Sequence, residues 1–417
     1  MLMKKVILRN FNHESRTIEQ LDVFVHDDDS LILIPSLYCL FLLYHLSHYK
    51  QIDIKLKNGT NQTQLVKADI SEGTAEQYIS HLDRFLRYLH KSDQENPDRN
   101  WLMLNHNLPA DIINHYINDI FIEQEKSSST AAAMCVSALT SYYNYLLKVN
   151  LTKSYRSLSI WAGNKTIAQK NTKRREGVKY LPQSTRNALL RQCTNLRDKI
   201  ILRCGAELGT RTKEVPGFYL KDFEYGQKTR KGLLTLFDEM DDNPDKTVFE
   251  YYLPGINSKG KPGKGGMSRK LYIEAELLQA MQEYYQQERP NSEHNTFFLK
   301  VDKRGYGEPI PNNQASSIFK KMKDKLLLMQ EQDNSLTYKI HEDHVFHIMR
   351  HSFGTDKFYQ IANDVGCAID AITASSTVMI QIAELLGHSL EGKDKGFKVT
   401  RSYIRSTREK MTMEGQK

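Results

Sequence analysis

The sequence predicts a mainly α-helical protein with a small antiparallel β-sheet, arranged as a helical domain followed by an α+β domain. Apolar residues recur at spacings of three and four over residues 68–150 and helical patterns dominate again near the C-terminus, which is the period of amphipathic helices. Short strand-like runs occur between these helical parts, at 233–237, 248–253 and 269–273. A length of 417 residues exceeds one ordinary core, so two or three domains are expected.

Residues 1–66 are expected to form a mixed α/β accessory domain. Two strand-like runs, 6–8 and 52–56, flank an apolar run at 31–46. That run contains Pro35 and is shorter than a bilayer span, so it predicts a buried helix and no membrane segment.

Residues 67–150 are expected to form a bundle of helices. A first helix is capped by Ser71 or Thr74, a second covers 110–122, and the hydroxyl-rich segment 127–130 begins a third. The apolar stripes of these helices are explained by the core that they share.

Residues 151–177 are predicted to form an exposed basic linker, because lysine and arginine far outnumber acidic residues there. A solvated charge run is the ordinary explanation of such a segment. Its position between two folded units also suits sequence-independent contact with DNA phosphates. On that second interpretation the DNA-binding residues are Lys170, Lys173, Arg174 and Arg175.

Residues 178–417 are expected to form the α+β domain. Helices are predicted at 183–192 and 197–208, ahead of the three strand-like runs. The second and third of these runs flank a glycine- and lysine-rich loop, 255–268, which predicts a long hairpin tip. Helices then follow to the C-terminus.

The bulk composition places few limits on function. A net charge of +8, from 58 basic and 50 acidic residues, is modest for this length and does not by itself identify a nucleic-acid binder. Five cysteines without a CxxC pair argue for a reducing compartment and against a disulfide framework or a zinc module. Met1 is not followed by a signal peptide, so a cytoplasmic location is expected.

Four short stretches stand out, and their order matters as much as their content. They are ELGTRTKEV at 207–215, GKGGMSRKL at 263–271, HIMRHSFGT at 347–355, and LLGH at 385–388 with TRSYI at 400–404. Each alone has an ordinary explanation, such as a salt bridge between Arg211 and Glu214 or a helix C-cap at Gly387. The ordered set is far more specific than any member.

The ordered set resembles the tyrosine recombinase (phage integrase) family. That family places an arginine after a glycine, a lysine in a β-hairpin, a His-x-x-Arg-His box, a Leu-Gly-His box and a C-terminal tyrosine in this order. The resemblance covers residues 181–408 well and residues 68–150 more weakly. It implies a helical core-binding domain of SAM-like fold before a tyrosine recombinase catalytic domain. For residues 1–66 it implies an accessory domain that contacts arm-type DNA or protein.

The resemblance assigns catalytic roles to residues of all four segments, namely Tyr403, Arg211, Arg350, Lys264, His347 and His388. Cleavage of a phosphodiester places extra negative charge on the phosphate oxygens, and arginine forks with a neighbouring histidine meet that charge. Tyrosine is a weak nucleophile until its proton is accepted, a task for His347. The leaving 5′ oxygen takes a proton from the hairpin lysine.

Two supporting residues and two open questions follow from the same comparison. Glu214 is expected to orient Arg211, and His351 to make a structural hydrogen bond. Lys264 is favoured as the acid over its neighbour Lys259. The long insertion between the Leu-Gly-His box and Tyr403 leaves open whether the tyrosine acts in its own subunit or in a neighbouring one.

The resemblance also implies partners and a setting. The expected partner is double-stranded DNA, bound by a tetramer on paired sites, with accessory DNA-bending or directionality factors. No metal, cofactor, ATP or membrane is expected, and the setting is the bacterial cytoplasm or nucleoid. The implied role is integration or excision of a mobile element through a 3′-phosphotyrosine intermediate.

Three other functions use related features. A type IB topoisomerase relaxes supercoils with similar residues, and recombination of two defined sites distinguishes the two activities. A catalytically silent DNA-binding protein on the same fold requires a missing catalytic position, and none is missing here. A metal-dependent nuclease or transposase predicts inhibition by a chelator, whereas cleavage in EDTA is expected here.

Overall fold

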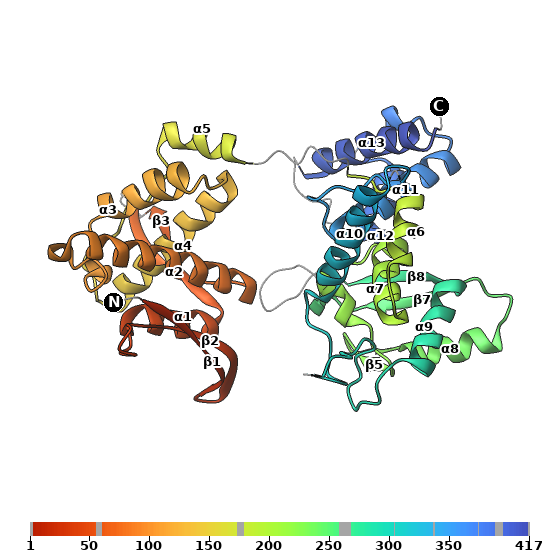
Figure 1. The fold of residues 1–417 in the computed structure, drawn as a ribbon, viewed down its shortest axis with the longest axis horizontal. Helices are drawn as coiled ribbons and strands as arrows, with labels where there is room; N and C mark the ends of the chain where they lie inside the picture. The colour runs from red at the N-terminus through yellow and green to blue at the C-terminus, as the bar shows by residue number, and fades with distance from the viewer. Residues whose placement is uncertain are drawn as a thin grey trace. The chain divides into compact units, whose positions relative to one another are not determined.

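The computed structural model describes most of the chain, namely residues 3–55, 61–172, 179–257, 268–303, 305–336, 338–373, 375–387 and 395–415. The chain forms two compact units, which meet in sequence at residues 174 and 175 (Figure 1). Within the described ranges the structure is mainly helical, with four two-stranded antiparallel sheets, which confirms the predicted fold class. Throughout those ranges, no helix has both the length and the apolar character needed to span a membrane.

The N-terminal unit begins with two hairpins and a helix. β1 (Lys4–His13) pairs with β2 (Arg16–Val25), and β3 (Ser47–Lys55) pairs with β4 (Asn61–Asp69). The helix α1 (Leu33–His45) lies between the hairpins in sequence. The two predicted strands and the predicted apolar helix are therefore confirmed.

The helices predicted for the following residues are also present, and they form the rest of this unit. They are α2 (Glu72–Glu95), α3 (Ala110–His115) with a π-helix η3 (Tyr116–Gln124), and α4 (Ser129–Lys148). The Ser71 side chain accepts a hydrogen bond from the backbone amide of Thr74 and caps α2, while Ser128 caps α4. One hydrophobic cluster runs from Met3 to Ala168, so the hairpins and the helices share a core.

Part of the segment predicted as an exposed linker is instead packed on the N-terminal unit. The helix α5 (Ala162–Asn171) buries Ala168, and the Asn118 amide donates to the Ser159 carbonyl and accepts from the Trp161 amide. The asparagine side chain thus supplies the hydrogen bonds that a strand or helix would otherwise provide. Few apolar residues are needed for such docking, so hydropathy did not reveal it.

The C-terminal unit contains most of the remaining elements. Its helices are α6 (Gln183–Arg191), α7 (Leu196–Glu207), α8 (Leu233–Asp242), α9 (Ala275–Gln287), α10 (Gln314–Gln332), α11 (His347–Asp364), α12 (Thr377–Leu386) and α13 (Lys395–Met413). Its strands are β5 (Phe223–Glu224), β6 (Thr229–Arg230), β7 (Val248–Leu253) and β8 (Arg269–Glu274). Helices α6 and α7, the predominance of helices toward the C-terminus and strands β7 and β8 agree with the predictions.

One predicted strand is wrong, because residues 233–237 lie in α8. Leu233, Leu236 and Phe237 are buried at helical spacing, so the run is one face of a helix. Gly232 precedes it, and a Cβ there would lie 2.3 Å from the backbone of Lys221. This close approach explains the glycine at the helix start.

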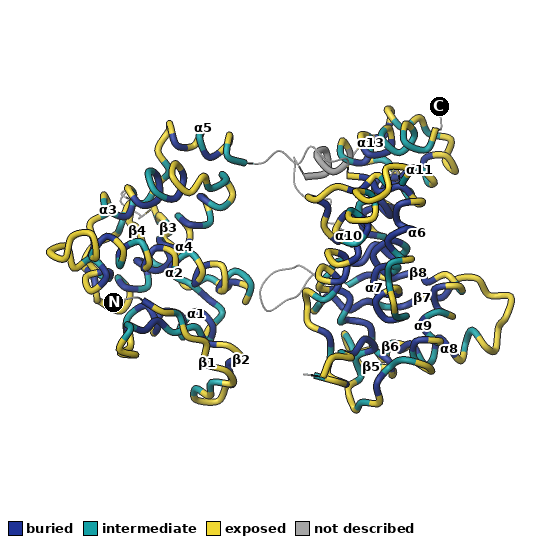
Figure 2. Tube along the Cα trace, viewed as in Figure 1, coloured by how far each residue is buried: buried dark blue, intermediate teal, exposed yellow. Residues whose placement is uncertain are grey.

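The core of the C-terminal unit surrounds α7 and α11 (Figure 2). β8 alternates buried and exposed residues, and its buried side carries Arg269 beside Leu271 and Ile273. A smaller apolar cluster joins α11, α12 and α13 and includes Phe358 and Tyr403. The site described next lies beside these two clusters.

Candidate active site

The site is built around the carboxylate of Glu214, which is fully buried. Glu214 lies in a 3-10 turn, η4 (Thr212–Gly217), that starts directly after Arg211. One carboxylate oxygen accepts the backbone amide of Arg211 at 2.9 Å, and the other accepts its guanidinium at 2.5 Å. This local turn fixes Arg211 and Glu214 with respect to each other, as the sequence predicted for the pair.

Two further arginines reach the same carboxylate from other elements. Arg269 of β8 donates to Glu214 at 2.9 Å, and Arg350 of α11 lies 3.8 Å from it. Arg350 also donates to the carbonyl oxygens of Gly209 and Leu386. The site therefore joins η4, β8, α11 and the end of α12.

The turn before Arg211 depends on a glycine. Gly209 has φ +61, and a Cβ there would lie 2.5 Å from the ring of Phe353. Its carbonyl oxygen accepts from both Arg269 and Arg350. The Gly-x-Arg spacing of the sequence is thus explained by backbone geometry and by close packing.

The electrostatics of this cluster reflect an excess of positive charge, with three guanidinium groups around one carboxylate. Burial opposes ionisation of Glu214, but Arg269, Arg350 and Arg211 outweigh it and lower its pKa to about 2. Burial, followed by the charges of Arg211 and Arg269, lowers the pKa of Arg350 to about 9. Because like charges are crowded there, an anion beside these arginines would be stabilised.

Tyr403 lies on α13 and is only 5% exposed. Its ring stacks on Phe358 of α11 with centroids 5.9 Å apart. Gly354 makes room for it, since a Cβ at that position would lie 2.8 Å from the Tyr403 hydroxyl. Burial raises the pKa of Tyr403 to about 12, while the charges of Arg350 and Arg211 act in the opposite direction. The positive charges of the two predicted arginines, Arg350 and Arg211, therefore act on the Tyr403 phenol.

The two histidines of the His-x-x-Arg-His box lie one turn apart on α11. His347 is exposed, and its ring lies edge to face with the ring of His351, with ring centroids 4.6 Å apart. Burial, together with His347, Lys179 and Arg350, lowers the pKa of His351 to about 3. His351 is therefore neutral near pH 7 and available as a hydrogen-bonding group.

Several predicted residues lie outside the described ranges. They are Lys264, Lys259, His388, Lys173, Arg174 and Arg175. Lys170 is described and is exposed on α5. Gly387 is the left-handed cap of α12, with φ +59, as its alternative explanation predicted.

Arg269 was not predicted as a site residue. It is buried, and it donates to Glu214 and to the carbonyl oxygens of Leu208, Gly209 and Leu385. The signal was an arginine in phase with Leu271 and Ile273 on the buried side of a strand. A charged residue at such a position requires buried partners.

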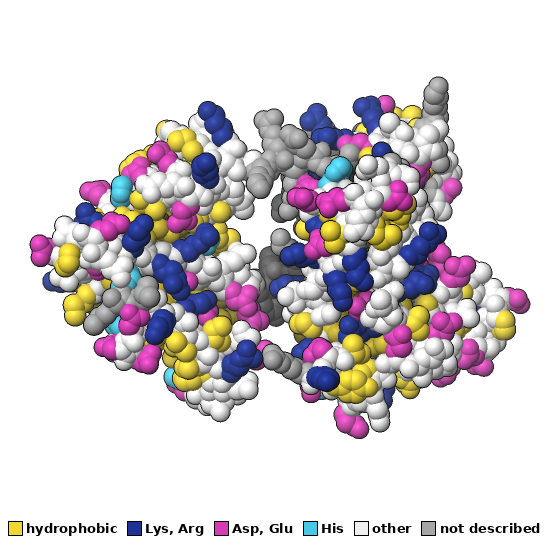
Figure 3. Space-filling model, viewed as in Figure 1, with side chains coloured by type: hydrophobic (Ala, Val, Ile, Leu, Met, Phe, Trp, Pro, Cys, Tyr) yellow, Lys and Arg dark blue, Asp and Glu magenta, His cyan; other side chains and the backbone are white. Residues whose placement is uncertain are grey.

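Surface charge does not mark the site by itself. Figure 3 shows lysine and arginine side chains interspersed with acidic ones on both units. Across the described part of the chain, no group of three or more His, Cys, Asp or Glu residues is arranged to hold a metal ion. The feature that marks the candidate site is therefore the arginine cluster around Glu214, with Tyr403 near it.

The chain is similar to several solved structures of recombinases and integrases. No family model matches the chain, and no curated protein matches it. XerA recombinase is similar at 16% identity, over 82% of this chain and 92% of that one, with a TM-score of 0.34. The Tn1549 transposon integrase in complex with transposon right end DNA is 14% identical over 74% of this chain and 86% of that one, with a TM-score of 0.41. A lambda integrase dimer bound to a core site is 13% identical over 79% of this chain and 95% of that one, with a TM-score of 0.39.

Proposed function

We propose that this chain is a site-specific DNA recombinase that cleaves and rejoins DNA through Tyr403. The observation that supports the proposal is the buried cluster of Arg211, Arg269 and Arg350 around Glu214, with the Tyr403 phenol in its field. This arrangement combines a nucleophile with a site for an anion. A DNA phosphate supplies that anion.

The division of labour among the arginines follows from their exposure. The Arg211 side chain is 22% exposed, whereas those of Arg269 and Arg350 are 3% and 2% exposed. Arg211 is therefore the guanidinium best able to reach a bound phosphate, with Arg350 beside it. Arg269 holds Glu214, and Glu214 holds Arg211 in place.

The reaction is a transesterification. The Tyr403 oxygen attacks the phosphorus, the bond to the 5′ oxygen breaks, and a 3′-phosphotyrosine forms. The phenol proton passes to a base, for which we propose His347, and the 5′ oxygen gains a proton from Lys264, with Lys259 as the alternative. We propose that His388 donates a hydrogen bond to a phosphate oxygen and that His351 supports the site. Reversal with a different 5′-hydroxyl joins a new strand, so the ester conserves the bond energy.

The wider assembly is proposed on the family resemblance. Double-stranded DNA is the partner, bound by residues 67–150, by the basic segment and by residues 178–417. Four chains act on paired sites, with accessory factors, in the integration or excision of a mobile element. Residues 1–66 contact DNA or protein, and the setting is the cytoplasm.

The first test is formation of a covalent protein–DNA adduct. A duplex bound by Tyr403→Phe protein is selected from a randomised library and is then nicked so that religation is blocked. The native chain should give an adduct stable to denaturant in EDTA, and Tyr403→Phe should give none, because it lacks the attacking oxygen. An adduct of undiminished yield in Tyr403→Phe would exclude this tyrosine.

A second test separates binding from cleavage. Arg350→Ala should bind the selected duplex but lose about 100-fold or more in adduct formation, because transition-state charge is no longer stabilised. Two-site substrates then distinguish a recombinase from a topoisomerase, which would relax any plasmid. Full binding with no adduct from the native chain would favour a catalytically silent DNA-binding protein.

A further inference from the structure

The helix that carries Tyr403 is fastened at its other end by a cluster of ionic side chains. Lys410 of α13 lies 2.8 Å from Asp356 of α11 and 2.9 Å from Glu414. Its ammonium also donates to the hydroxyl of Tyr180 at 3.1 Å, and Arg186 of α6 lies 2.5 Å from Asp356. We call these five residues, Tyr180, Arg186, Asp356, Lys410 and Glu414, the α13 anchor.

The α13 anchor is partly shielded from solvent and balanced in charge. Tyr180 and Arg186 are buried, while the side chains of Lys410, Glu414 and Asp356 are 12%, 22% and 28% exposed. Two cations face two carboxylates, and the single proton of the Tyr180 hydroxyl is shared between Asp356 at 2.9 Å and Glu414 at 2.6 Å. Partly buried charges are screened by salt less than fully exposed ones, so the ion pairs of the anchor are expected to persist at physiological ionic strength.

Within the part of α13 whose side chains are described, Tyr403 and Ile404 pack against the apolar cluster shared with α11 and α12. Among residues 401–415, the buried ones are Tyr403, Ser406 and Thr407, of which the last two are polar. Tyr403 and Lys410 lie seven residues apart, which places them on one face about two turns from each other. Movement of Lys410 along or around the helix would therefore carry Tyr403 with it.

We propose that the α13 anchor is the device that positions Tyr403 in the site of its own chain. This inference rests on the proposed function, because positioning matters only if Tyr403 reacts. Lys410 and Asp356 act through the tyrosine and do not touch the phosphate. The anchor ties α13 to α11, the helix that carries Arg350, so nucleophile and arginine move as one body and cleavage occurs in cis.

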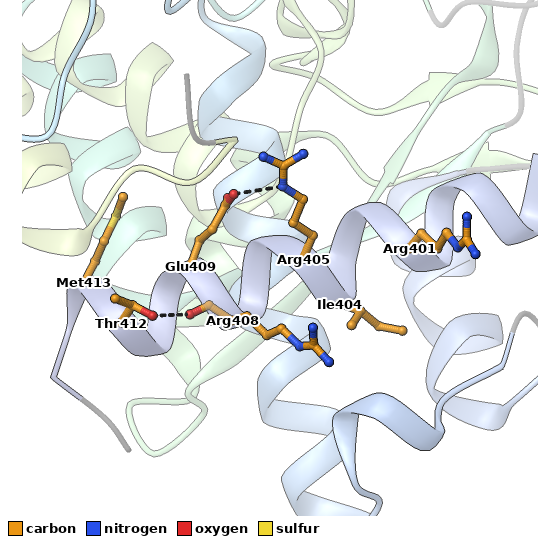
Figure 4. A pocket seen from close by; sticks show the side chains of 7 residues that line it. All are labelled: Arg401, Ile404, Arg405, Arg408, Glu409, Thr412 and Met413. Atoms are coloured by element: carbon orange, nitrogen blue, oxygen red, sulfur yellow. Dashed lines mark hydrogen bonds and ion pairs between the residues drawn. The ribbon is translucent and has the colours of Figure 1, made fainter. Parts of the chain in front are cut away.

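The opposite face of α13 provides a matched control. Arg408 pairs with Asp370 at 2.6 Å, but both side chains are 65% exposed. Figure 4 shows Arg408 among the side chains of α13 that line a pocket, on the same side of the helix as Ile404. Arg408→Met removes one charge from the same helix without touching the α13 anchor.

The test compares Lys410→Met, Asp356→Asn and Arg408→Met in single-turnover cleavage of the selected nicked duplex. The two anchor variants should lose about 10- to 100-fold in rate, as expected for a nucleophile displaced by a fraction of an ångström. Their DNA affinity should stay within about twofold of the native value, since no phosphate contact is changed. Lys410→Arg should restore most of the rate and Arg408→Met should retain it, whereas native rates in both anchor variants would overturn the proposal.

Mixing experiments test action in cis. Arg350→Ala chains, which keep Tyr403, are mixed with Tyr403→Phe chains, which keep the arginines. The mixture should form no more adduct than either chain alone. Recovery of cleavage would show action in a neighbouring subunit and would overturn the inference.

Amide hydrogen exchange of the chain without DNA separates this inference from the proposed function. Lys410→Met should speed exchange in α13 about tenfold or more, and Arg408→Met should not, because Lys410 belongs to the anchor and Arg408 does not. If the native chain forms no adduct but exchange responds as expected, the recombinase proposal fails and the anchor stands as a structural element. If exchange in α13 is unchanged by Lys410→Met, the anchor itself is excluded.

Discussion

Glu214 is the residue on which the arrangement of the arginines depends. It is fully buried and contacts Arg211, Arg269 and Arg350, which come from different parts of the sequence. A neutral side chain at this position would leave three guanidinium groups crowded together without a balancing charge. The residue therefore has a structural role on which the proposed reaction depends.

Replacement of Glu214 by glutamine should lower stability and cleavage together. Removing one partner of a buried ionic cluster costs about 3–5 kcal/mol, because the remaining charges stay buried. Urea unfolding at pH 7 measures the loss. Lys270→Met, which breaks the exposed pair of Lys270 with Glu250, is the control and should change stability by less than about 1 kcal/mol.

Acid should destabilise the protein through Glu214 and His351. The pKa of Glu214 in the folded chain is about 2, below its ordinary value of 4.5, so its stabilisation is complete above pH 4.5 and is lost as pH falls toward 2. The pKa of His351 is about 3, below 6.5, so the folded form also loses stability as pH falls below 6.5. Unfolding free energies measured from pH 7 to pH 3 should fall, and the gap between native and Glu214→Gln should narrow below pH 4.5. A constant gap would contradict this assignment.

At the scale of the elements, the sequence predicts those whose periodicity is local. Helices α2 and α4 and strands β7 and β8 were predicted because capping residues and apolar spacing lie within each element. The run 233–237 was assigned wrongly because five apolar-rich residues fit a strand as well as a buried helix face. Contacts distant in sequence, such as the Tyr38 hydroxyl with Ser141 at 2.7 Å, leave no local pattern.

The candidate site shows the same difference between residues that local motifs predict and residues that only long-range contacts reveal. Arg211, Glu214, Arg350 and Tyr403 follow from ordered motifs, and the structure brings them together. Arg269 was missed because a single arginine in a strand is ordinary until its buried partners are known. The α13 anchor is equally invisible in the sequence, since its members are spread from Tyr180 to Glu414.

The docking of the segment before α5 depends on Asn118 of η3. Its side chain is buried and makes hydrogen bonds with Asn114, Ser159 and Trp161. Asn118→Ala should therefore lower the unfolding free energy of the N-terminal unit by roughly 2–3 kcal/mol, as buried backbone groups lose partners. Asn114→Ala, at a less buried position, should cost less, and equal losses would argue against this role.

At the scale of the whole molecule, packing of α5 shortens the connection between the two units. The described N-terminal unit extends to Thr172, and the described part of the C-terminal unit begins at Lys179. Seven residue steps span at most about 25 Å. The last described residue of the N-terminal unit and the first of the C-terminal unit are therefore joined by a short connection.

Lengthening this connection should weaken DNA binding without removing any contact. Insertion of 12 glycine and serine residues after Gly177 should lower affinity for the selected duplex roughly fourfold, because the local concentration of one unit near the other falls with tether length. The dependence of affinity on salt should be unchanged, since the same phosphates are neutralised. Unaltered affinity would indicate that one unit binds alone.

If the chain binds DNA as proposed, this short connection also affects how it dissociates. When one unit dissociates, the covalent connection keeps it close to the other unit, so rebinding competes with escape. Complete dissociation then requires both units to release DNA at nearly the same time. The complex therefore lasts longer than a complex of either unit alone. A chain that must wait for a second DNA site would benefit from such persistence.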